Sequence, residues 1–268
     1  MNTALPSFRP FPAVIRIATL AFGVIIPLAA FAELTTDSLL GPGLRSRPAY
    51  DGSDSRHTEL VPVVRYLGQP WFARSTQGVV EGGVRMEFAP GLHAGAQLAY
   101  ESGRKTSESG FLKSHNVADI DRGASVGLHL EWDHKLGPMP ITLLGRIRQH
   151  TDTNRGAQAD IRLSAGVFQK GPVALGLFTQ ATWANAKSAG SLYGLTPQQA
   201  AGTGLPAYSA GSGLLFASFG LLWGVDLSKN WIVVGSMEAR RLHGDAARSP
   251  LAERTSNHYV SAGLAYRF

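Results

Sequence analysis

The polar residues whose spacing comes closest to a catalytic set lie in the segment IDRGASVGLHLEWD, residues 120–133. Ser125 and His129 are four residues apart on one side of an alternating pattern, and Glu131 lies on the same side. A serine activated by a histidine is the arrangement of many acyl hydrolases. On an extended strand, however, four residues span about 13 Å, so the two side chains cannot hydrogen-bond directly. The pattern favours a polar interior lining over catalysis.

Metal and cofactor sites have no better support. The chain has eight histidines and no cysteine, which excludes disulfide frameworks and zinc sites built on thiolates. The segment YDGSD at 50–54 is rich in oxygen ligands but lacks the rest of a calcium loop. No glycine-rich loop opens a helix, as a phosphate site requires. The net charge of +6 is scattered along the chain and forms no basic stripe. We expect no enzyme activity, no cofactor, no metal and no nucleic-acid partner.

The N-terminal segment is typical of an export signal. Two arginines lie before or within an apolar run over residues 13–30, which ends in Ala-Phe-Ala before Glu33. A single membrane anchor is the alternative, and the small residues at the end of the run favour cleavage. We predict a secretory signal peptide over residues 1–32 and one barrel domain over residues 33–268.

Alternation of apolar and polar residues recurs along the rest of the chain. Its segments run ten to fourteen residues, longer than the five or six residues usual in globular strands and close to what a tilted strand needs to cross a bilayer. Short turns such as 68–70 and 170–172 alternate with long polar stretches such as 102–119 and 184–211. This is the arrangement of outer-membrane barrels, with short periplasmic turns and long extracellular loops.

The sequence therefore predicts an all-β fold: a closed antiparallel transmembrane β-barrel of about twelve strands, with ten as the alternative. The count depends on residues 71–88, where a tight hairpin near Gln77 and Gly78 must separate two strands. Every backbone donor and acceptor must pair in lipid, so the last strand is expected to pair with the first.

Charged residues on the polar faces of these strands are expected to project into the lumen. Both signs occur, and pairing between neighbouring strands would narrow the bore, so we expect a narrow or closed pore. The residues are Glu59, Arg65, Arg74, Glu81, Arg85, Glu87, Glu101, Glu131, Arg146, Arg148, Asp160, Arg162, Glu238 and Arg240.

The chain ends NHYVSAGLAYRF, a strand that finishes on an aromatic residue. Leu264, Tyr266 and Phe268 share the apolar face, which a closed barrel turns toward lipid. This pattern resembles the C-terminal signal by which the barrel-assembly machinery recognises its clients.

Three loop segments resemble the MipA/OmpV family of outer-membrane proteins. They are AYDGSD (49–54), SLYGLTPQQAAGTGLPAYSAGSGL (191–214) and LHGDAARSPL (242–251), in the order expected for the family. Thr203 begins the Thr-Gly-Leu step where the family pattern has Ser-Gly-Leu. The motif residues are Tyr50, Gly52, Ser53, Asp54, Tyr193, Gly194, Thr203, Gly204, Leu205, Tyr208, Gly244, Asp245, Ser249 and Pro250.

The resemblance implies a barrel in the outer membrane that acts as a scaffold. It would bring a membrane-bound lytic transglycosylase together with a bifunctional penicillin-binding protein and so link peptidoglycan cleavage to synthesis. Other members are described as porin-like or adhesive. A narrow porin-like channel or osmotic-response pore, and an adhesin acting through its loops, are therefore the alternatives. The partners expected are outer-membrane lipid, the barrel-assembly machinery and the two murein enzymes.

The long loop 184–211 is expected to pack within the barrel mouth, with direct partner binding as the alternative. Within it, Thr196 and Pro197 suit the N-cap and first position of a helical turn over residues 196–201.

Overall fold

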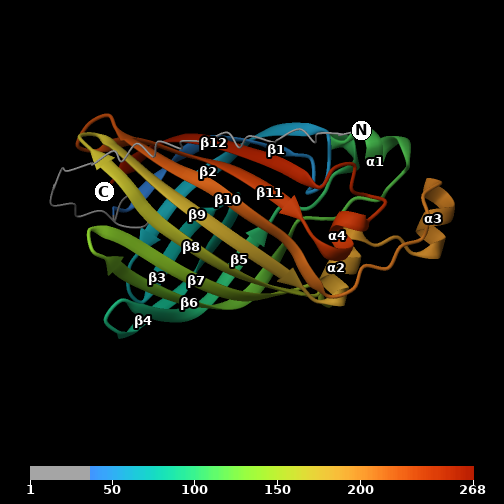
Figure 1. The fold of residues 1–268 in the computed structure, drawn as a ribbon, viewed down its shortest axis with the longest axis horizontal. Coiled ribbons are helices and arrows are strands. Elements are labelled where there is room, and N and C mark those ends of the chain that lie inside the picture. Colours follow the sequence, from blue (N-terminus) through green and yellow to red (C-terminus); the bar gives the residue numbers. More distant parts are fainter. Residues whose placement is uncertain (1–36) are drawn as a thin grey trace, which may run out of the picture.

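Twelve antiparallel strands form a closed barrel in which each strand pairs with its neighbours in the chain and the last pairs with the first (Figure 1). The computed structural model describes residues 37–268. The signal peptide predicted over residues 1–32 lies outside the described residues. The barrel prediction is confirmed, and the alternative of ten strands is wrong because residues 71–88 form two strands rather than one.

The strands are ten to fourteen residues long, except for one of six. Their bounds are β1 Leu39–Pro48, β2 Arg56–Leu67, β3 Trp71–Thr76, β4 Val79–Ala89, β5 Leu92–Glu101, β6 Gly123–Leu136, β7 Met139–His150, β8 Ala157–Lys170, β9 Val173–Ala184, β10 Gly213–Asp226, β11 Trp231–Leu242 and β12 Ser256–Arg267.

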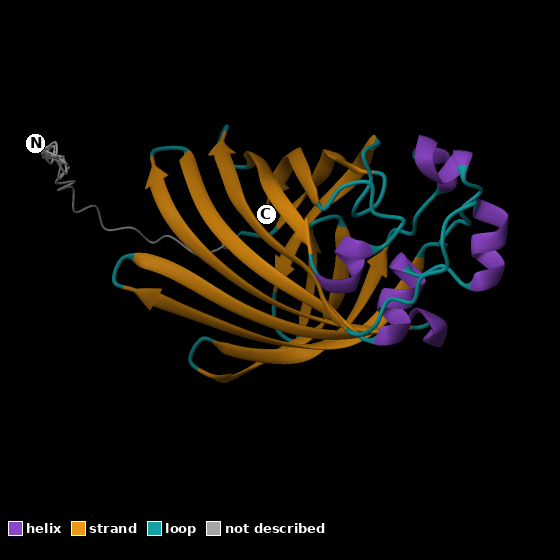
Figure 2. Cartoon of the chain, turned by 45° about the vertical axis from the view of Figure 1, so that its right-hand side comes forward, coloured by secondary structure: helices purple, strands orange, loops and turns teal. Residues whose placement is uncertain are grey.

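Short helices lie in the long loops at one end of the barrel (Figure 2). They are α1 Gly110–Ser114, α2 Ala186–Tyr193, α3 Pro197–Thr203 and α4 Gly244–Arg248, with 3-10 turns η1 Thr106–Glu108 and η2 Thr153–Arg155. Among the described residues, no helix is both long and apolar enough to cross a bilayer.

The two faces of the sheet follow the alternation of the sequence. Large apolar side chains face outward: Leu60 is 80% exposed, Leu128 66% and Ile147 64%. Buried side chains on the inner face include Arg146 and Glu81. The exterior is thus apolar and the interior charged, the reverse of a soluble domain and the distribution of a barrel in lipid.

The hairpin between β3 and β4 turns at Gln77 and Gly78, which have φ angles of 53° and 82°. Two consecutive residues with positive φ are typical of the tight type I′ hairpin. Strand β3 is only six residues long. It pairs with β4 over its whole length but with β2 only through Arg65–Leu67.

The extracellular mouth has its own apolar core. One cluster joins α2, β10 and β11 through Tyr193, Phe216 and Leu242. A second joins the β5–β6 loop to the last loop through Leu112 and Leu251. Helices α1, α2 and α4 therefore pack at the mouth of the barrel, while the opposite rim has only short turns (Figure 2).

Candidate functional site

An ion-pair network fills one side of the lumen, along the inner face of β3 to β8. Neighbouring strands place Arg74 opposite Glu81 and Arg146 opposite Asp160. The Arg74 Nε donates to Glu81 at 2.5 Å, and the Arg146 Nε donates to Asp160 at 2.9 Å. Arg146 also donates to both oxygens of Glu81, at 3.0 and 3.1 Å. That contact joins β7 to β4, so it crosses the concave wall rather than following the sheet.

Glu131 forms a second such crossing. Its carboxylate accepts from Arg74 at 2.7 Å and from Arg85 at 2.8 Å. Since Arg74 bonds both Glu81 and Glu131, the two groups of ion pairs are continuous. Arg148 extends the network to Glu101 at 3.4 Å and Asp160 at 3.5 Å.

A separate cluster lies on the other side of the lumen, beneath the mouth. Arg240 on β11 pairs with Glu238 at 3.0 Å and with Asp51 of the first loop at 2.8 Å. Its guanidinium lies over the rings of Phe216 and Tyr259, at 4.0 and 4.4 Å from their centres. These contacts satisfy the buried cation with two carboxylates and two aromatic faces.

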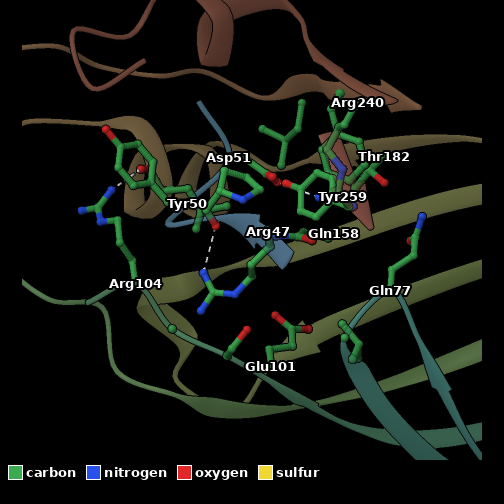
Figure 3. Close-up of a pocket in the computed structure, with 18 of the residues that line it drawn as sticks. Arg47, Tyr50, Asp51, Gln77, Glu101, Arg104, Gln158, Thr182, Arg240 and Tyr259 are labelled. Atoms are coloured by element: carbon green, nitrogen blue, oxygen red, sulfur yellow. Dashed lines mark hydrogen bonds and ion pairs between the residues drawn. The ribbon is translucent and has the colours of Figure 1, made fainter. Parts of the chain in front are cut away.

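Two cavities of about 220 Å³ each lie in the remaining lumen. The outer one, below the mouth, is shown in Figure 3. Its charged lining consists of seven arginines and two carboxylates, Arg45, Arg47, Arg104, Arg146, Arg148, Arg155, Arg240, Asp51 and Glu101. The inner cavity shares Arg45, Tyr259 and the β3–β4 turn with the outer one. Arg45 and this turn therefore lie where the two cavities meet.

The other predicted lumen charges take different places. Arg162 faces the lumen with its guanidinium 3.8 Å from the centre of the Phe178 ring. Glu87 lies at the periplasmic rim, where it is exposed and accepts from the Gly91 N–H at 2.9 Å. Glu87 thus stabilises a turn and lies outside the network.

Arg45, Arg47 and Asp51 were missed by the sequence reasoning. The two arginines alternate in the segment LLGPGLRSRP of β1, so the period-2 pattern was the signal that could have found them. Glu59 of β2 pairs with Arg47 at 3.0 Å and with Arg45 at 3.7 Å. Asp51 lies in a loop, and the pattern gives no indication that it faces Arg240.

Ser125 and His129 do not form a catalytic pair. The Ser125 hydroxyl donates to Glu101 at 2.9 Å, and the His129 ring packs edge-on against Phe72, with centres 4.9 Å apart. Both side chains therefore contact other residues of the lumen wall and not each other.

His93, Glu131 and Asp133 form the one group of three possible metal ligands within the described residues, with ligand atoms within 4.8 Å of one another. Glu131 already accepts from Arg74 and Arg85. Two guanidinium groups on this carboxylate disfavour a cation there.

The family-motif residues hold the three extracellular loops together. In the first loop, the Tyr50 hydroxyl donates to the Leu251 carbonyl at 2.8 Å. Gly52 has a φ of 102°, and its N–H donates to Asn257 at 2.7 Å. Ser53 and Asp54 both contact the last loop: the Ser53 hydroxyl donates to Glu253 at 3.2 Å, and Asp54 pairs with Arg254.

The long loop is tied to the last loop in the same way. The Ser249 hydroxyl donates to the Tyr193 carbonyl at 2.6 Å. The Tyr208 hydroxyl donates to the Asp245 carbonyl at 2.9 Å. The motif therefore encodes packing of the mouth. Gly194 and Gly204 follow the ends of α2 and α3, Thr203 ends α3, Leu205 packs against the second mouth cluster, Gly244 begins α4, and Pro250 lies beside Ser249.

The predicted helical turn at Thr196 is confirmed. The helix α3 begins at Pro197, and Thr196 and Gln199 form a capping box. No residue of α3 is buried, and the helix projects beyond α2 and α4 (Figure 1). The long loop thus packs in the mouth through α2 and projects outward through α3.

Burial shifts the pKa of two mouth residues outside the strands. Burial lowers the pKa of Arg104, whose Nη1 donates to the Leu192 carbonyl at 2.9 Å and whose guanidinium lies 5.7 Å from the centre of the Tyr50 ring. Burial raises the pKa of Tyr193 well above its ordinary value. Tyr193 is therefore neutral at physiological pH.

The C-terminal strand places Leu264, Tyr266 and Phe268 on the outer face, at 42%, 42% and 67% exposure. Tyr266 packs edge-on against Trp231 of β11, with ring centres 5.3 Å apart. The Phe268 N–H donates to the Ser38 carbonyl at 3.2 Å, which extends the closing seam to the last residue.

The closed twelve-strand barrel, its apolar outer face and its charged lumen define a β-barrel protein of the outer membrane. The model of the MltA-interacting protein MipA family matches residues 40–268, and the chain belongs to this family.

Two solved structures align with the chain at low sequence identity. An outer membrane channel from Pseudomonas putida F1 aligns with a TM-score of 0.50 and 11% identity, over 91% of this chain and all of that one. The NanC porin aligns with a TM-score of 0.47 and 10% identity, over 86% of this chain and all of that one. No curated protein sequence matches the chain significantly.

Proposed function

We propose that the protein is a non-enzymatic scaffold of the outer membrane that links a lytic transglycosylase to a bifunctional penicillin-binding protein. The observation that carries the proposal is the family match, which covers the barrel from residue 40 to the C-terminus and bears the description MltA-interacting protein. The export signal over residues 1–32 is part of the proposal.

The lumen supports a scaffold better than a wide diffusion pore. Contacts between β4 and β7 and between β3 and β6 cross the inner wall. Side chains that bond one another across a barrel occupy its bore and tie distant strands together. The barrel is therefore rigid, and its outer surfaces keep a fixed shape for partner binding.

The periplasmic rim offers a surface for such contacts. Lys135, Lys170 and Lys229 are exposed beside three separate turns on that rim. These lysines, which share the rim with the exposed carboxylate of Glu87, can pair with acidic groups of a partner, because complementary charge steers association. We propose that the murein enzymes bind there.

Co-purification from cells tests this proposal. A tagged barrel with Lys135→Glu, Lys170→Glu and Lys229→Glu is expected to lose the transglycosylase and the synthase. A matched variant with Lys113→Glu and Lys187→Glu in the extracellular loops, both exposed positions, is expected to retain them. Equal recovery with both variants would rule out the rim as the binding surface.

A narrow channel is the second candidate, favoured by the two cavities that meet at Arg45. Arginines outnumber carboxylates in the outer cavity, so such a channel would prefer anions. Recordings in planar bilayers test it: small steps with anion selectivity support a channel, and a silent bilayer containing folded barrel excludes it.

A further inference from the structure

The barrel wall has a gap in its outer half. Strand β2 pairs with β1 from Arg56 to Arg65. On its other side β2 pairs with β3 only at residues 65–67. Within the described part of the chain, residues 56–63 of β2 therefore have no ladder partner toward β3. The backbone of Val64 forms hydrogen bonds with the Ser75 side chain instead.

The hydrogen bonds of Val64 show which backbone groups of β2 point toward β3. Its N–H donates to the Ser75 hydroxyl at 3.0 Å, and its carbonyl accepts from that hydroxyl at 3.4 Å. Backbone groups alternate along a strand, so Pro62 and Leu60 point to the same side as Val64. Proline has no N–H to leave unpaired and suits a strand edge. Leu60 is 80% exposed, so the strand along this edge carries an apolar side chain on the lipid-facing side.

The β3–β4 hairpin borders the gap, and its tip contacts a side chain from the lumen face of β1. Gly78 lies directly against the Arg45 guanidinium, so a side chain at this position would displace that guanidinium. Arg45 belongs to the lumen face of β1 and is 8% exposed. The hairpin tip thus contacts Arg45 of β1, while the outer part of β2 has no ladder partner toward β3.

The inner cavity lies beside this gap. Its lining includes outward-facing residues from both sides of the gap, Pro62 and Val64 from β2 and Ser75 and Val80 from the hairpin. The cavity of about 220 Å³ thus extends to the lipid side of the wall.

The cavity has an apolar part and a cationic part. Lumen-facing Val61, Val63, Leu222 and Val234 line the apolar part. Its charged lining is Arg45, Arg65, Arg74, Arg162 and Glu238.

Arg45 is the cation best placed for a ligand. Its ion-pair partner within residues 37–268 is Glu59 at 3.7 Å, longer than a charge-assisted hydrogen bond. Its guanidinium lies 5.1 Å from the centre of the Tyr259 ring. A buried guanidinium held this loosely retains donors for an anion.

We propose that the inner cavity binds a medium-chain carboxylate, which enters from the outer leaflet through the gap between β2 and the β3–β4 hairpin. Its carboxylate pairs with Arg45, and its chain lies along Val61, Val63 and Val234. The cavity is smaller than the roughly 300–1,000 Å³ of sites for drug-sized ligands, which favours a single short chain over a phospholipid. The inference does not depend on the scaffold role.

Displacement of a fluorescent fatty acid tests the site. Barrel in nanodiscs is loaded with cis-parinarate and titrated with decanoate or with decanol. Arg45→Gln is expected to weaken decanoate binding by at least about tenfold and to leave decanol binding unchanged, because only the carboxylate uses the guanidinium. Equal loss for both ligands, or no loss for decanoate, would overturn the assignment.

Two further variants protect the test from misfolding. Arg45→Lys retains the charge and is expected to bind decanoate within a few-fold of wild type. Val63→Gln is expected to weaken both ligands, since it places an amide on the apolar part. A ligand chain that fills the cavity must contact residue 63. Unchanged binding of both ligands by Val63→Gln would therefore contradict the proposal.

The rate of ligand uptake tests whether the ligand enters through the gap between β2 and the β3–β4 hairpin. Val80→Trp places a large ring at the gap, on the outward-facing side of the cavity lining, and is expected to slow both uptake and release of cis-parinarate at the nanodisc bilayer at least several-fold. The same rate in wild type and Val80→Trp would rule out entry through the wall.

Discussion

Arg146 on β7 donates to both carboxylate oxygens of Glu81 on β4, at 3.0 and 3.1 Å, across the inner wall of the barrel. Glu81 also accepts from Arg74 and from the amide of Gln97, at 2.5 and 2.9 Å. One buried carboxylate thus connects β3, β4, β5 and β7. Ion pairs of this kind, between strands that are not neighbours, connect the walls of the lumen. The stability of the barrel, the packing of its mouth and its assembly can be tested separately.

Glu81→Gln is expected to destabilise the barrel by about 3 kcal/mol or more, because it leaves buried guanidinium groups without their counter-charge. Urea unfolding of the refolded barrel in detergent measures the change. Glu87→Gln is the matched control. Glu87 is exposed at the rim, so its change is expected to cost under about 1 kcal/mol. Equal midpoints for the two variants would contradict a structural network.

Ser249→Ala is expected to loosen the mouth without unfolding the barrel. The Ser249 hydroxyl donates to the Tyr193 carbonyl at 2.6 Å and accepts from the Leu251 N–H at 3.1 Å. Losing a buried hydroxyl of this kind costs about 1–3 kcal/mol. Protease cleavage within residues 184–211 should accelerate roughly five-fold or more. Ser114→Ala, at an exposed hydroxyl, should leave the cleavage rate unchanged, and equal rates for both variants would refute the role of Ser249.

The β5–β6 loop is expected to loosen in acid. The Asp119 carboxylate accepts hydrogen bonds from the Thr106 N–H and from the Lys105 ammonium. These bonds, that of Thr106 most of all, lower the pKa of Asp119 to about 2. Because the pKa is lowered in the folded state, the anchoring is complete above the ordinary value of 3.8 and is lost as the pH falls toward 2.

A spin label at Lys113→Cys measures this loosening, since the chain has no other cysteine. Its mobility should be constant from pH 7 to about 4 and should rise below that. With Asp119→Asn the label should be mobile at neutral pH and insensitive to acid. A wild-type transition near neutral pH would contradict the assignment to Asp119.

Deleting Phe268 is expected to impair assembly more than stability. The ring is 67% exposed on the outer face, so its loss removes little packing from the finished barrel. The folded, heat-modifiable band in cells should fall sharply, while refolding in detergent stays near wild type. Phe268→Tyr should assemble normally. Normal insertion of the deletion variant would remove the proposed signal role.

The alternation of the sequence was enough to predict the barrel, because a strand has a period of two. It could not predict that Glu81 meets Arg146. Contacts across the lumen depend on the diameter and stagger of the closed sheet, which no local pattern encodes.

The mouth was partly predictable. Thr196 and Pro197 gave α3 a start signal of its own. Helices α1 and α4, five residues each, are too short to be stable alone and depend on tertiary packing. The gap beside β2 was missed for a related reason: the turn at Gly78 was recognisable, but its contact with Arg45 joins it to β1, two strands away, and no local pattern encodes such a contact.

Binding among purified components tests the scaffold proposal most directly. Tagged barrel in nanodiscs, the lytic transglycosylase and the bifunctional penicillin-binding protein are mixed and separated by size. The proposal predicts a complex of all three that disappears with the Lys135, Lys170 and Lys229 changes and persists with the Lys113 and Lys187 changes. Association of the two enzymes to the same extent without the barrel, or binding of neither enzyme to it, would contradict the proposal.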